Sequence, residues 1–320
     1  YVSPLKALSN DIQKNLDEPL AGIRKELFES GLPDVDIRTV VRTGDTPQSE
    51  RERMRRKPPH ILITTPESLF LMLTSAARET LANVDTVIID EIHALAPTKR
   101  GAHLMVSLER LEEITTKPFQ RIGLSATQRP LEEVARFLGG SRDGMARKVQ
   151  IVNAGVRKEL DVQVVVAVED MGDLGKPTTE LRSGPATAAL TERRSSIWPS
   201  VYPKILDLVL EHKSTIIFCN ARRQAERLAA NINELAVERG VGGSGVHELV
   251  KAHHGSLARE QRVIIEDQLK RGELRALVAT SSLELGIDMG AVDLVIQVES
   301  PGAVSRGMQR VGRAGHQVGQ

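Results

Sequence analysis

Val87-Ile88-Ile89-Asp90-Glu91-Ile92-His93 is the stretch that decides the fold of this chain. It begins as a run of branched apolar residues and changes abruptly to two acids. Continuous apolar runs are typical of parallel strands that are buried on both faces. Ligands of parallel sheets bind at the carboxyl ends of strands, where the two acids stand. The stretch therefore predicts a buried parallel strand that delivers two carboxylates to a ligand site.

Short apolar runs alternate with helical patterns along the rest of the chain. The predicted strands are Asp36–Arg42, His60–Thr64, Thr86–Asp90, Gln120–Leu124, Ser214–Asn220, Leu274–Ala279 and Leu294–Val298. The predicted helices include Ala102–Ile114, Arg222–Glu238 and Ala258–Arg271. In the first of these helices, Leu104, Leu108 and Leu111 recur at helical spacing and should line one face. The alternation predicts an α/β fold with parallel sheets flanked by helices.

One interruption of this pattern divides the chain into two domains. Glu169–Ser196 is rich in Gly, Pro, Ser, Thr and charged residues, a composition typical of a linker or surface excursion. Order resumes at Trp198-Pro199. We therefore expect a first domain at 1–155, a linker at 156–197 with one candidate strand at Val162–Val168, and a second domain at 198–320. Both domains show the same strand–helix rhythm.

Composition excludes several classes of protein. With 320 residues, 40% of them hydrophobic, the chain can bury a substantial core, and no apolar run reaches the roughly 18 residues that a membrane span needs. A single cysteine, Cys219, excludes a disulfide framework and a cysteine-based zinc site, and favours a reducing, cytoplasmic location. Aromatic residues make up only 2%. Any nucleic acid should therefore be held by its phosphates rather than by base stacking, without sequence specificity.

The acids after the first quoted strand suit phosphoryl transfer. Asp90 could hold Mg²⁺ through water, and Glu91 could polarise the water that attacks a γ-phosphate. The same acids could instead begin a helix, where negative charge is favoured. His93 taken alone is more often a hydrogen-bonded structural residue. Ser125 and Thr127 follow another predicted strand, where they could either sense the acidic loop or only cap a helix.

A second motif, Gln309-Arg310-Val311-Gly312-Arg313-Ala314-Gly315-His316, lies far along the chain. Glycines let a backbone approach a phosphate, and guanidinium groups neutralise the charge of a transferring phosphoryl group. The alternative is a surface turn with solvated arginines. Together with the acidic pair, this motif suggests a nucleotide held between two domains whose movement is driven by hydrolysis.

Several polar loops are expected at the ends of strands, where they could form a track for phosphodiester oxygens. They contain Lys6, Thr43-Gly44-Asp45, Thr64-Thr65-Pro66-Glu67 and Thr280-Ser281. A basic run from Arg51 to Lys57 precedes the strand His60–Thr64. For this run, a solvated helix face is the favoured interpretation.

Taken in order, the motifs resemble those of a superfamily 2 DEAD/DEAH-type helicase core, and most closely the Lhr (large helicase-related) family. The matching segments are Ser3-Pro4-Leu5-Lys6-Ala7-Leu8 (motif Ia), Thr65-Pro66-Glu67-Ser68-Leu69 (Ib), Asp90-Glu91-Ile92-His93 (II), Ser125-Ala126-Thr127 (III), Ile217-Phe218-Cys219-Asn220-Ala221-Arg222 (IV), Ala279-Thr280-Ser281-Ser282-Leu283-Glu284-Leu285-Gly286-Ile287-Asp288 (V) and Gln309 to His316 (VI). Ser196-Ile197-Trp198-Pro199-Ser200-Val201-Tyr202-Pro203 and the Gly-Arg-Ala-Gly-His ending favour Lhr over other members.

The resemblance implies two tandem RecA-like domains that bind ATP and Mg²⁺ and carry nucleic acid across both. Asp90 would hold the metal through water, Glu91 would position the attacking water, and Arg313 would act as an arginine finger. His93, Ser125 and Thr127 would couple hydrolysis to domain motion. The implied nucleotide-binding residues are Gly286, Asp288, Gln309, Arg310, Gly312 and His316. The implied nucleic-acid contacts are Ser3, Lys6, Gly44, Thr65, Arg222 and Thr280.

The implied activity is ATP-dependent 3′-to-5′ translocation on single-stranded DNA, with unwinding of DNA and RNA–DNA duplexes in DNA repair. The chain departs from the family in two respects: His316 stands where many members have a second arginine, and no stretch reads G-x-x-x-x-G-K-[ST]. We therefore expect an N-terminally truncated first domain, negligible ATP turnover by residues 1–320 alone, and a winged-helix domain downstream. An RNA helicase of the same superfamily and a non-catalytic nucleic-acid-binding tandem remain as alternatives.

Overall fold

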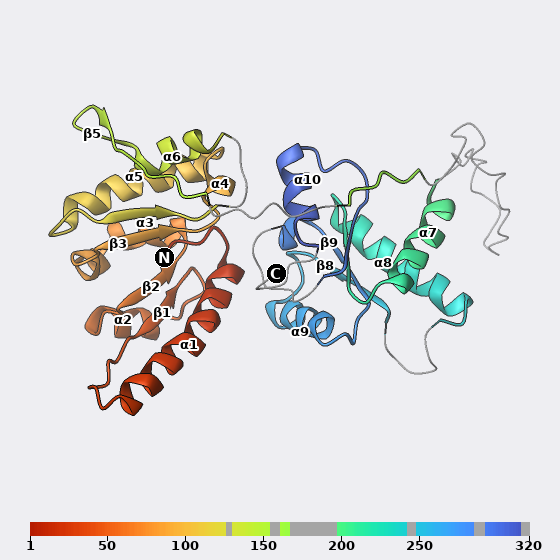
Figure 1. Ribbon diagram of the computed structural model, residues 1–320, viewed down its shortest axis with the longest axis horizontal. Helices are drawn as coiled ribbons and strands as arrows, with labels where there is room; N and C mark the ends of the chain where they lie inside the picture. Colours follow the sequence, from red (N-terminus) through yellow and green to blue (C-terminus); the bar gives the residue numbers. More distant parts are fainter. Residues whose placement is uncertain (126–129, 154–160, 167–196, 242–247, 285–291, 315–320) are drawn as a thin grey trace, which may run out of the picture. The chain divides into compact units, whose positions relative to one another are not determined.

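The computed structural model describes residues 1–125, 130–153, 161–166, 197–241, 248–284 and 292–314 (Figure 1). The described residues form two compact units. The first contains residues 1–125 and 130–153, and the second contains residues 161–166, 197–241, 248–284 and 292–314. The predicted domain boundaries at 155 and 197 fall inside or beside segments outside the described residues, so they stay predictions.

The first unit is built on parallel strands. They are β1 (Thr39–Arg42), β2 (Ile61–Thr64), β3 (Thr86–Ile89) and β4 (Gln120–Gly123), followed by a small antiparallel hairpin of β5 (Ser141–Arg142) and β6 (Met145–Ala146). β1 pairs with β2 and β3 pairs with β4, both in parallel. Val2 bridges the two pairs, because it forms parallel bridges with Thr64 and with Ile89. The resulting order is β1, β2, residues 1–3, β3, β4, which confirms the four strands predicted for this unit.

Helices cover this sheet. They are α1 (Lys6–Glu29), α2 (Gln48–Arg56), α3 (Pro66–Leu73), η1 (Ala76–Leu81), α4 (Ile92–Leu95), α5 (Lys99–Ile114) and α6 (Leu131–Gly139). α1 lies along β1 and β2, and α3 packs against α5 (Figure 1). Leu104, Leu108 and Leu111 of α5 are all buried in the core, which confirms the predicted apolar face. The helical interpretation of the basic run is also confirmed, because Arg51–Arg56 lie within α2.

The second unit contains a four-stranded parallel sheet in the order β10-β7-β9-β8. Its strands are β7 (Thr215–Phe218), β8 (Val250–His253), β9 (Ala276–Ala279) and β10 (Leu294–Gln297). Every residue of β7 and β9 is buried, as their apolar runs predict. The edge strand β8 was not predicted, because Val-Lys-Ala-His contains no continuous apolar run.

The helices of the second unit are α7 (Trp198–Glu211), α8 (Arg222–Glu238), α9 (Arg259–Lys270), η2 (Ser281–Leu283) and α10 (Val304–Val311). α8 has the predicted bounds, and α9 lies within the predicted helix Ala258–Arg271. α7 and α8 pack against each other and share one core with the sheet.

The candidate strand Val162–Val168 is wrong where the structure describes it. Residues 161–166 form no strand, and the valines among them are exposed to solvent. The last two residues of the candidate, Ala167 and Val168, lie outside the described residues, as does the rest of the predicted linker up to Ser196. A β-branched run alone does not make a strand, because a strand needs a neighbour for its backbone hydrogen bonds.

The helices in the part of the chain that the structure describes can be compared in length and hydropathy with a membrane span. Among the helices there, none combines the length and apolarity required to cross a membrane.

Two glycines of the first unit should respond in opposite ways to alanine. A Cβ at Gly101 would overlap the carbonyl oxygen of Leu95, whereas a Cβ at Gly22 would meet nothing within 4 Å. We expect Gly101→Ala to lower the free energy of unfolding by about 1–3 kcal/mol through this overlap. Gly22→Ala, inside helix α1, should raise it by up to about 1 kcal/mol. Urea titrations of both variants check the prediction, and equal effects would contradict the close approach at Leu95.

Candidate functional site

The acidic turn follows β3 directly. Asp90 extends the strand by donating its backbone N–H to the carbonyl of Val2 at 2.9 Å, and its Oδ1 accepts the N–H of Glu91 at 2.9 Å. Glu91 has φ 44° and ψ 41°, so it lies in the left-handed region before α4 begins at Ile92. This conformation costs a non-glycine residue on the order of 1 kcal/mol, and strained residues of this kind cluster at functional sites. The turn thus holds two adjacent carboxylates in a fixed, unfavourable geometry.

The environment of Asp90 favours a cation beside it. Burial raises the pKa of the Asp90 carboxyl, and the negative charge of Glu91 raises it further. A hydrogen bond from the Tyr1 side chain opposes this shift and lowers the pKa. A metal ion beside Asp90 would offset the cost of burying its negative charge, and it would reduce the repulsion between the two carboxylates.

The donor set fits Mg²⁺ bound together with a phosphate. Among the described residues, no group of three or more His, Cys, Asp or Glu is arranged to hold a metal ion. Mg²⁺ does not need such a group, since it keeps several waters and is commonly held by one or two carboxylates and by phosphate oxygens. Asp90 and Glu91 could supply the protein's share.

His93 connects the acidic turn to the loop after β4. Its side chain is buried, with Nε2 3.4 Å from Glu91 Oε2 and Nδ1 3.2 Å from Ser125 Oγ. Burial lowers the pKa of His93, while the charges of Glu91 and Asp90 act in the opposite direction. The neutral imidazole satisfies both contacts if Nε2–H faces the carboxylate and Nδ1 accepts the hydroxyl proton. The structure therefore brings Asp90, Glu91, His93 and Ser125 together.

The loop after β1 meets the start of α1. Lys6 Nζ lies 2.6 Å from Asp45 Oδ1, and a Cβ at Gly44 would lie 3.3 Å from the same nitrogen. Arg51 supports the loop from α2 by donating to the carbonyls of Thr46 at 2.7 Å and Gly44 at 2.9 Å. Lys6 of α1 and Gly44 are therefore neighbours. The loop that contains Gly44 has two of its carbonyls bound by Arg51.

Ser3 and Thr65 have buried side chains that serve the local fold. Ser3 Oγ donates to the carbonyl of Leu5 at 3.1 Å, and Thr65 Oγ1 caps α3 by accepting the N–H of Ser68 at 3.4 Å. Both residues are almost fully shielded from solvent. Contact between these two residues and nucleic acid stays a prediction.

In the second unit, the described residues of the predicted phosphate motif are arranged around Arg310. It is only 2% exposed, yet it lies in α10 at the predicted phosphate motif. Its guanidinium donates to Glu284 Oε1 at 2.8 Å, to Gln297 Oε1 at 2.9 Å and to Asn220 Oδ1 at 3.2 Å, and it lies over the Phe218 ring. Arg310 thus joins the ends of three strands, and its predicted contact with nucleotide stays a prediction.

Glu284, the main partner of Arg310, is not among the site residues predicted from the sequence. The signal was an acid between two leucines, Leu283-Glu284-Leu285, which is unexpected in an apolar setting. Glu284 also accepts a hydrogen bond at its backbone carbonyl, from Arg313 Nη2 at 3.0 Å. The two arginines of the motif therefore both converge on one residue.

The other predicted residues of the second unit that the structure describes lie in α10, at the start of α8 and after β9. Gln309 lies in α10, and Gly312 ends it by donating its N–H to the carbonyl of Met308 at 2.9 Å. Arg222 begins α8 and donates to Ser256 Oγ. Thr280 follows β9 and donates its backbone N–H to the carbonyl of His253 at 3.3 Å. Thr127, Gly286, Asp288 and His316 lie outside the described residues.

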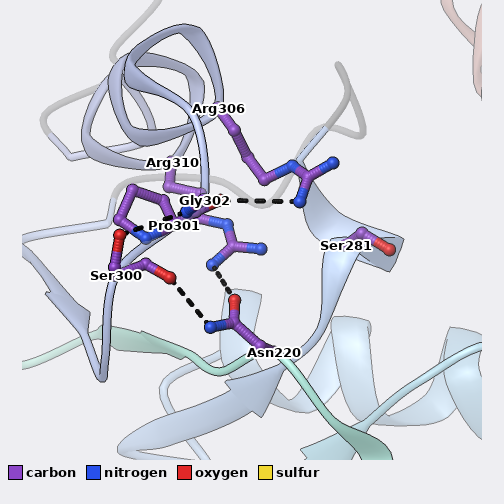
Figure 2. A pocket seen from close by; sticks show the side chains of 7 residues that line it. All are labelled: Asn220, Ser281, Ser300, Pro301, Gly302, Arg306 and Arg310. Carbon is purple, nitrogen blue, oxygen red and sulfur yellow. Dashed lines mark hydrogen bonds between the residues drawn. The ribbon is translucent and has the colours of Figure 1, made fainter.

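A cavity of ≈ 180 Å³ opens beside Arg310 (Figure 2). Asn220, Ser281, Arg306 and the turn 300–302 complete its lining. In Figure 2, Asn220 reaches both Arg310 and the Ser300 carbonyl, the latter at 2.8 Å. The cavity is polar and cationic, and it lies where strands β7, β9 and β10 end.

Two family models match the chain. Residues 1–135 match the DEAD/DEAH box helicase model, and residues 200–317 match the helicase conserved C-terminal domain. The chain is similar to a solved structure of Mycobacterium smegmatis helicase Lhr bound to ssDNA and AMP-PNP, with a TM-score of 0.83 and 55% identity. That match covers 100% of this chain and 38% of the other. The predicted pair of RecA-like domains is thereby confirmed.

Curated relatives agree with these matches. The "Lhr helicase/ probable uracil glycosylase" of Mycolicibacterium smegmatis is 52% identical over 100% of this chain and 21% of the relative. The "ATP-dependent helicase Lhr-Core" of Methanothermobacter thermautotrophicus is 47% identical over 100% of this chain and 34% of the relative. The chain thus spans about a fifth to a third of the length of these relatives. The chain belongs to the Lhr family of DEAD/DEAH box helicases.

Proposed function

We propose that the protein hydrolyses ATP and uses the energy to move 3′-to-5′ along single-stranded DNA, opening duplexes that include RNA–DNA hybrids. The observation that carries this proposal is the acidic turn, in which a strained Glu91 contacts the buried His93, and His93 contacts Ser125. A strained, pre-positioned carboxylate with a neutral neighbour suits a group that orients water. The similar Mycobacterium smegmatis helicase Lhr has been solved with ssDNA and AMP-PNP bound, which supports both ligands.

The residues have distinct parts in the proposed reaction. Asp90 holds Mg²⁺ through water, and Glu91 positions the water that attacks the γ-phosphate. The metal, when bound, neutralises charge on the phosphates. Arg313 acts as the arginine finger, and the nucleotide site is completed by Gly286, Asp288, Gln309, Arg310, Gly312 and His316. His93, Ser125 and Thr127 report hydrolysis to the loops that hold nucleic acid.

Ser3, Lys6, Gly44, Thr65, Arg222 and Thr280 are the proposed nucleic-acid contacts. They hold phosphates, so binding does not depend on sequence. We place the activity in cytoplasmic DNA repair, with a winged-helix domain in the intact protein. Residues 1–320 alone should not turn over ATP, since they contain no G-x-x-x-x-G-K-[ST] stretch. The tests below therefore use the protein expressed from its complete gene.

Glu91→Gln should lower the kcat of ATP hydrolysis by about 100-fold or more, because general-base contributions typically reach that size. The substitution keeps the side chain's size but removes the negative charge that orients water. Nucleotide binding should persist, and fluorescence with a labelled ATP analogue measures it beside the steady-state rate.

Glu132→Gln is the matched control, since it neutralises an exposed glutamate of α6 in the same unit. It should leave kcat within about twofold, as surface substitutions usually do. Hydrolysis that is undiminished in Glu91→Gln would show that another group orients the water.

DNA and RNA strands of equal length and sequence should stimulate the ATPase unequally. We expect half-maximal stimulation at a lower concentration of single-stranded DNA, and a steep rise of that concentration with salt because the contacts are to phosphates. Titrations of both strands at several salt concentrations measure this. Equal or stronger stimulation by RNA would favour the RNA helicase alternative.

Acidification should destabilise the first unit through His93. Its folded pKa is lowered by burial, so below the unfolded value of about 6.5 the unfolded chain binds a proton that the folded chain resists. The stability contributed by neutral His93 is present above that pH and is lost as the pH falls towards the folded pKa. Urea unfolding at about pH 7.5 and about pH 5.5 should show a smaller loss in His93→Gln than in the wild type.

His103→Gln removes an exposed imidazole from the same unit and is the control for loss of a histidine. An identical loss of stability in His93→Gln and the wild type would mean that His93 is not held in its neutral form.

A further inference from the structure

Arg100 of α5 joins the loop before α1 to the first turn of α3. Its Nε and Nη2 both donate to the Glu67 carboxylate, Nη2 reaching Oε2 at 2.9 Å. Its Nη1 donates to the carbonyl of Pro4 at 2.6 Å. A planar guanidinium can donate two hydrogen bonds to a carboxylate and a third to a carbonyl on its other side. A lysine ammonium cannot reproduce this geometry.

The stability of α5 does not explain a cation at this position. Arg100 lies in the first turn of the helix, which contains no acid and begins with Lys99. The helix dipole disfavours positive charge there by about 0.3–1 kcal/mol. The pair with Glu67 is also largely exposed, at 38% and 55% of the side chains, so it stabilises the fold by at most about 1 kcal/mol.

The contact favours the ionised form of Glu67. The pKa of the Glu67 carboxyl is lowered, first by its hydrogen bond from Arg100 and despite partial burial. Glu67 lies in the first turn of α3, where the helix dipole already favours an acid. The helix dipole and Arg100 therefore both favour the charged form of Glu67.

Arg100 also connects these loops to the acidic turn. Lys6 lies two residues after Pro4, and Thr65 lies two residues before Glu67; both are proposed nucleic-acid contacts. On the other side, the backbone of Gly101 approaches the Leu95 carbonyl so closely that a Cβ would overlap it. Leu95 ends α4, the short helix that starts after Glu91. A series of contacts and short chain connections thus runs from the acidic turn to the Pro4 loop and the start of α3.

We infer that Arg100 is a positioning residue: it sets the separation of the Pro4 and Thr65 loops and links their occupation by single-stranded DNA to ATP hydrolysis at the acidic turn. This inference rests on the proposed function, and no direct contact of Arg100 with either ligand is required. Because the pair adds little to stability, its loss should change coupling rather than folding.

The test compares three variants of the protein expressed from its complete gene. Arg100→Ala removes all contacts, and Arg100→Lys keeps the charge without the fork. Arg110→Ala is the matched control, because Arg110 is a cation of the same helix that also faces α3, over the Phe70 ring at 5.9 Å. The probes are ATP-Mg²⁺ and an oligothymidylate strand, and the readouts are kcat, the KM for ATP and the half-saturating DNA concentration.

We expect Arg100→Ala to raise the half-saturating DNA concentration about tenfold, as loss of a charge-assisted contact would. Arg100→Lys should fall between Arg100→Ala and the wild type, and the KM for ATP should change less than about twofold in both. Arg110→Ala should keep the wild-type DNA dependence. Thermal unfolding should show Arg100→Lys folded to within a few degrees of the wild type.

The outcomes distinguish failure of the proposed function from failure of the role assigned to Arg100. A wild-type ATPase that does not respond to DNA would overturn the proposed function. A responsive wild type with an unchanged half-saturating concentration in Arg100→Ala and Arg100→Lys would overturn the role of Arg100. Equal shifts in Arg100→Ala and Arg110→Ala would overturn it as well, because the loss of one positive charge would then be sufficient.

Discussion

The hydrogen bonds of Val2 and Ser3 make one sheet out of two strand pairs. Val2 donates to the Ile88 carbonyl at 2.7 Å, and Ser3 donates to the Thr64 carbonyl at 2.8 Å. Because all these segments are parallel, their carboxyl ends meet at one edge. The acidic turn at Asp90 and the Thr65 cap are therefore neighbours through backbone pairing, before any side chain is considered. Without residues 1–3, β2 and β3 would lose their common partner.

Buried charge plays the equivalent part in the second unit. A guanidinium that is 2% exposed is costly unless each face finds a partner. Glu284, Asn220 and Gln297 accept its hydrogen bonds, and Phe218 covers its face. Removal of any one acceptor would leave the buried guanidinium with an incomplete set of hydrogen-bond partners. Arg310 thus holds the ends of β7, β9 and β10 together, in addition to any contact with a ligand.

Sequence alone predicts the parts of the structure that follow from continuous burial. β3, β7 and β9 consist almost entirely of apolar residues, so their positions and the polar loops after them could be read directly. β8 could not, because an edge strand with Lys251 is specified by its neighbour rather than by its own apolarity. The Arg310–Glu284 pair was hidden for a similar reason: two residues 26 positions apart become partners only through the path of the chain between them.

Three residues near the proposed site break local rules of sequence and structure. Glu91 takes a left-handed backbone without being glycine, Arg100 places a cation at a helix N-terminus, and Arg310 is buried. Each choice is unfavourable by itself, and sequences that fold well usually avoid such conflicts unless function requires them. All three lie in or near the helicase motifs. Asp143 and Glu299 also have positive φ and lie outside these motifs. Local conflict and family motif therefore mark this part of the molecule only when they are taken together.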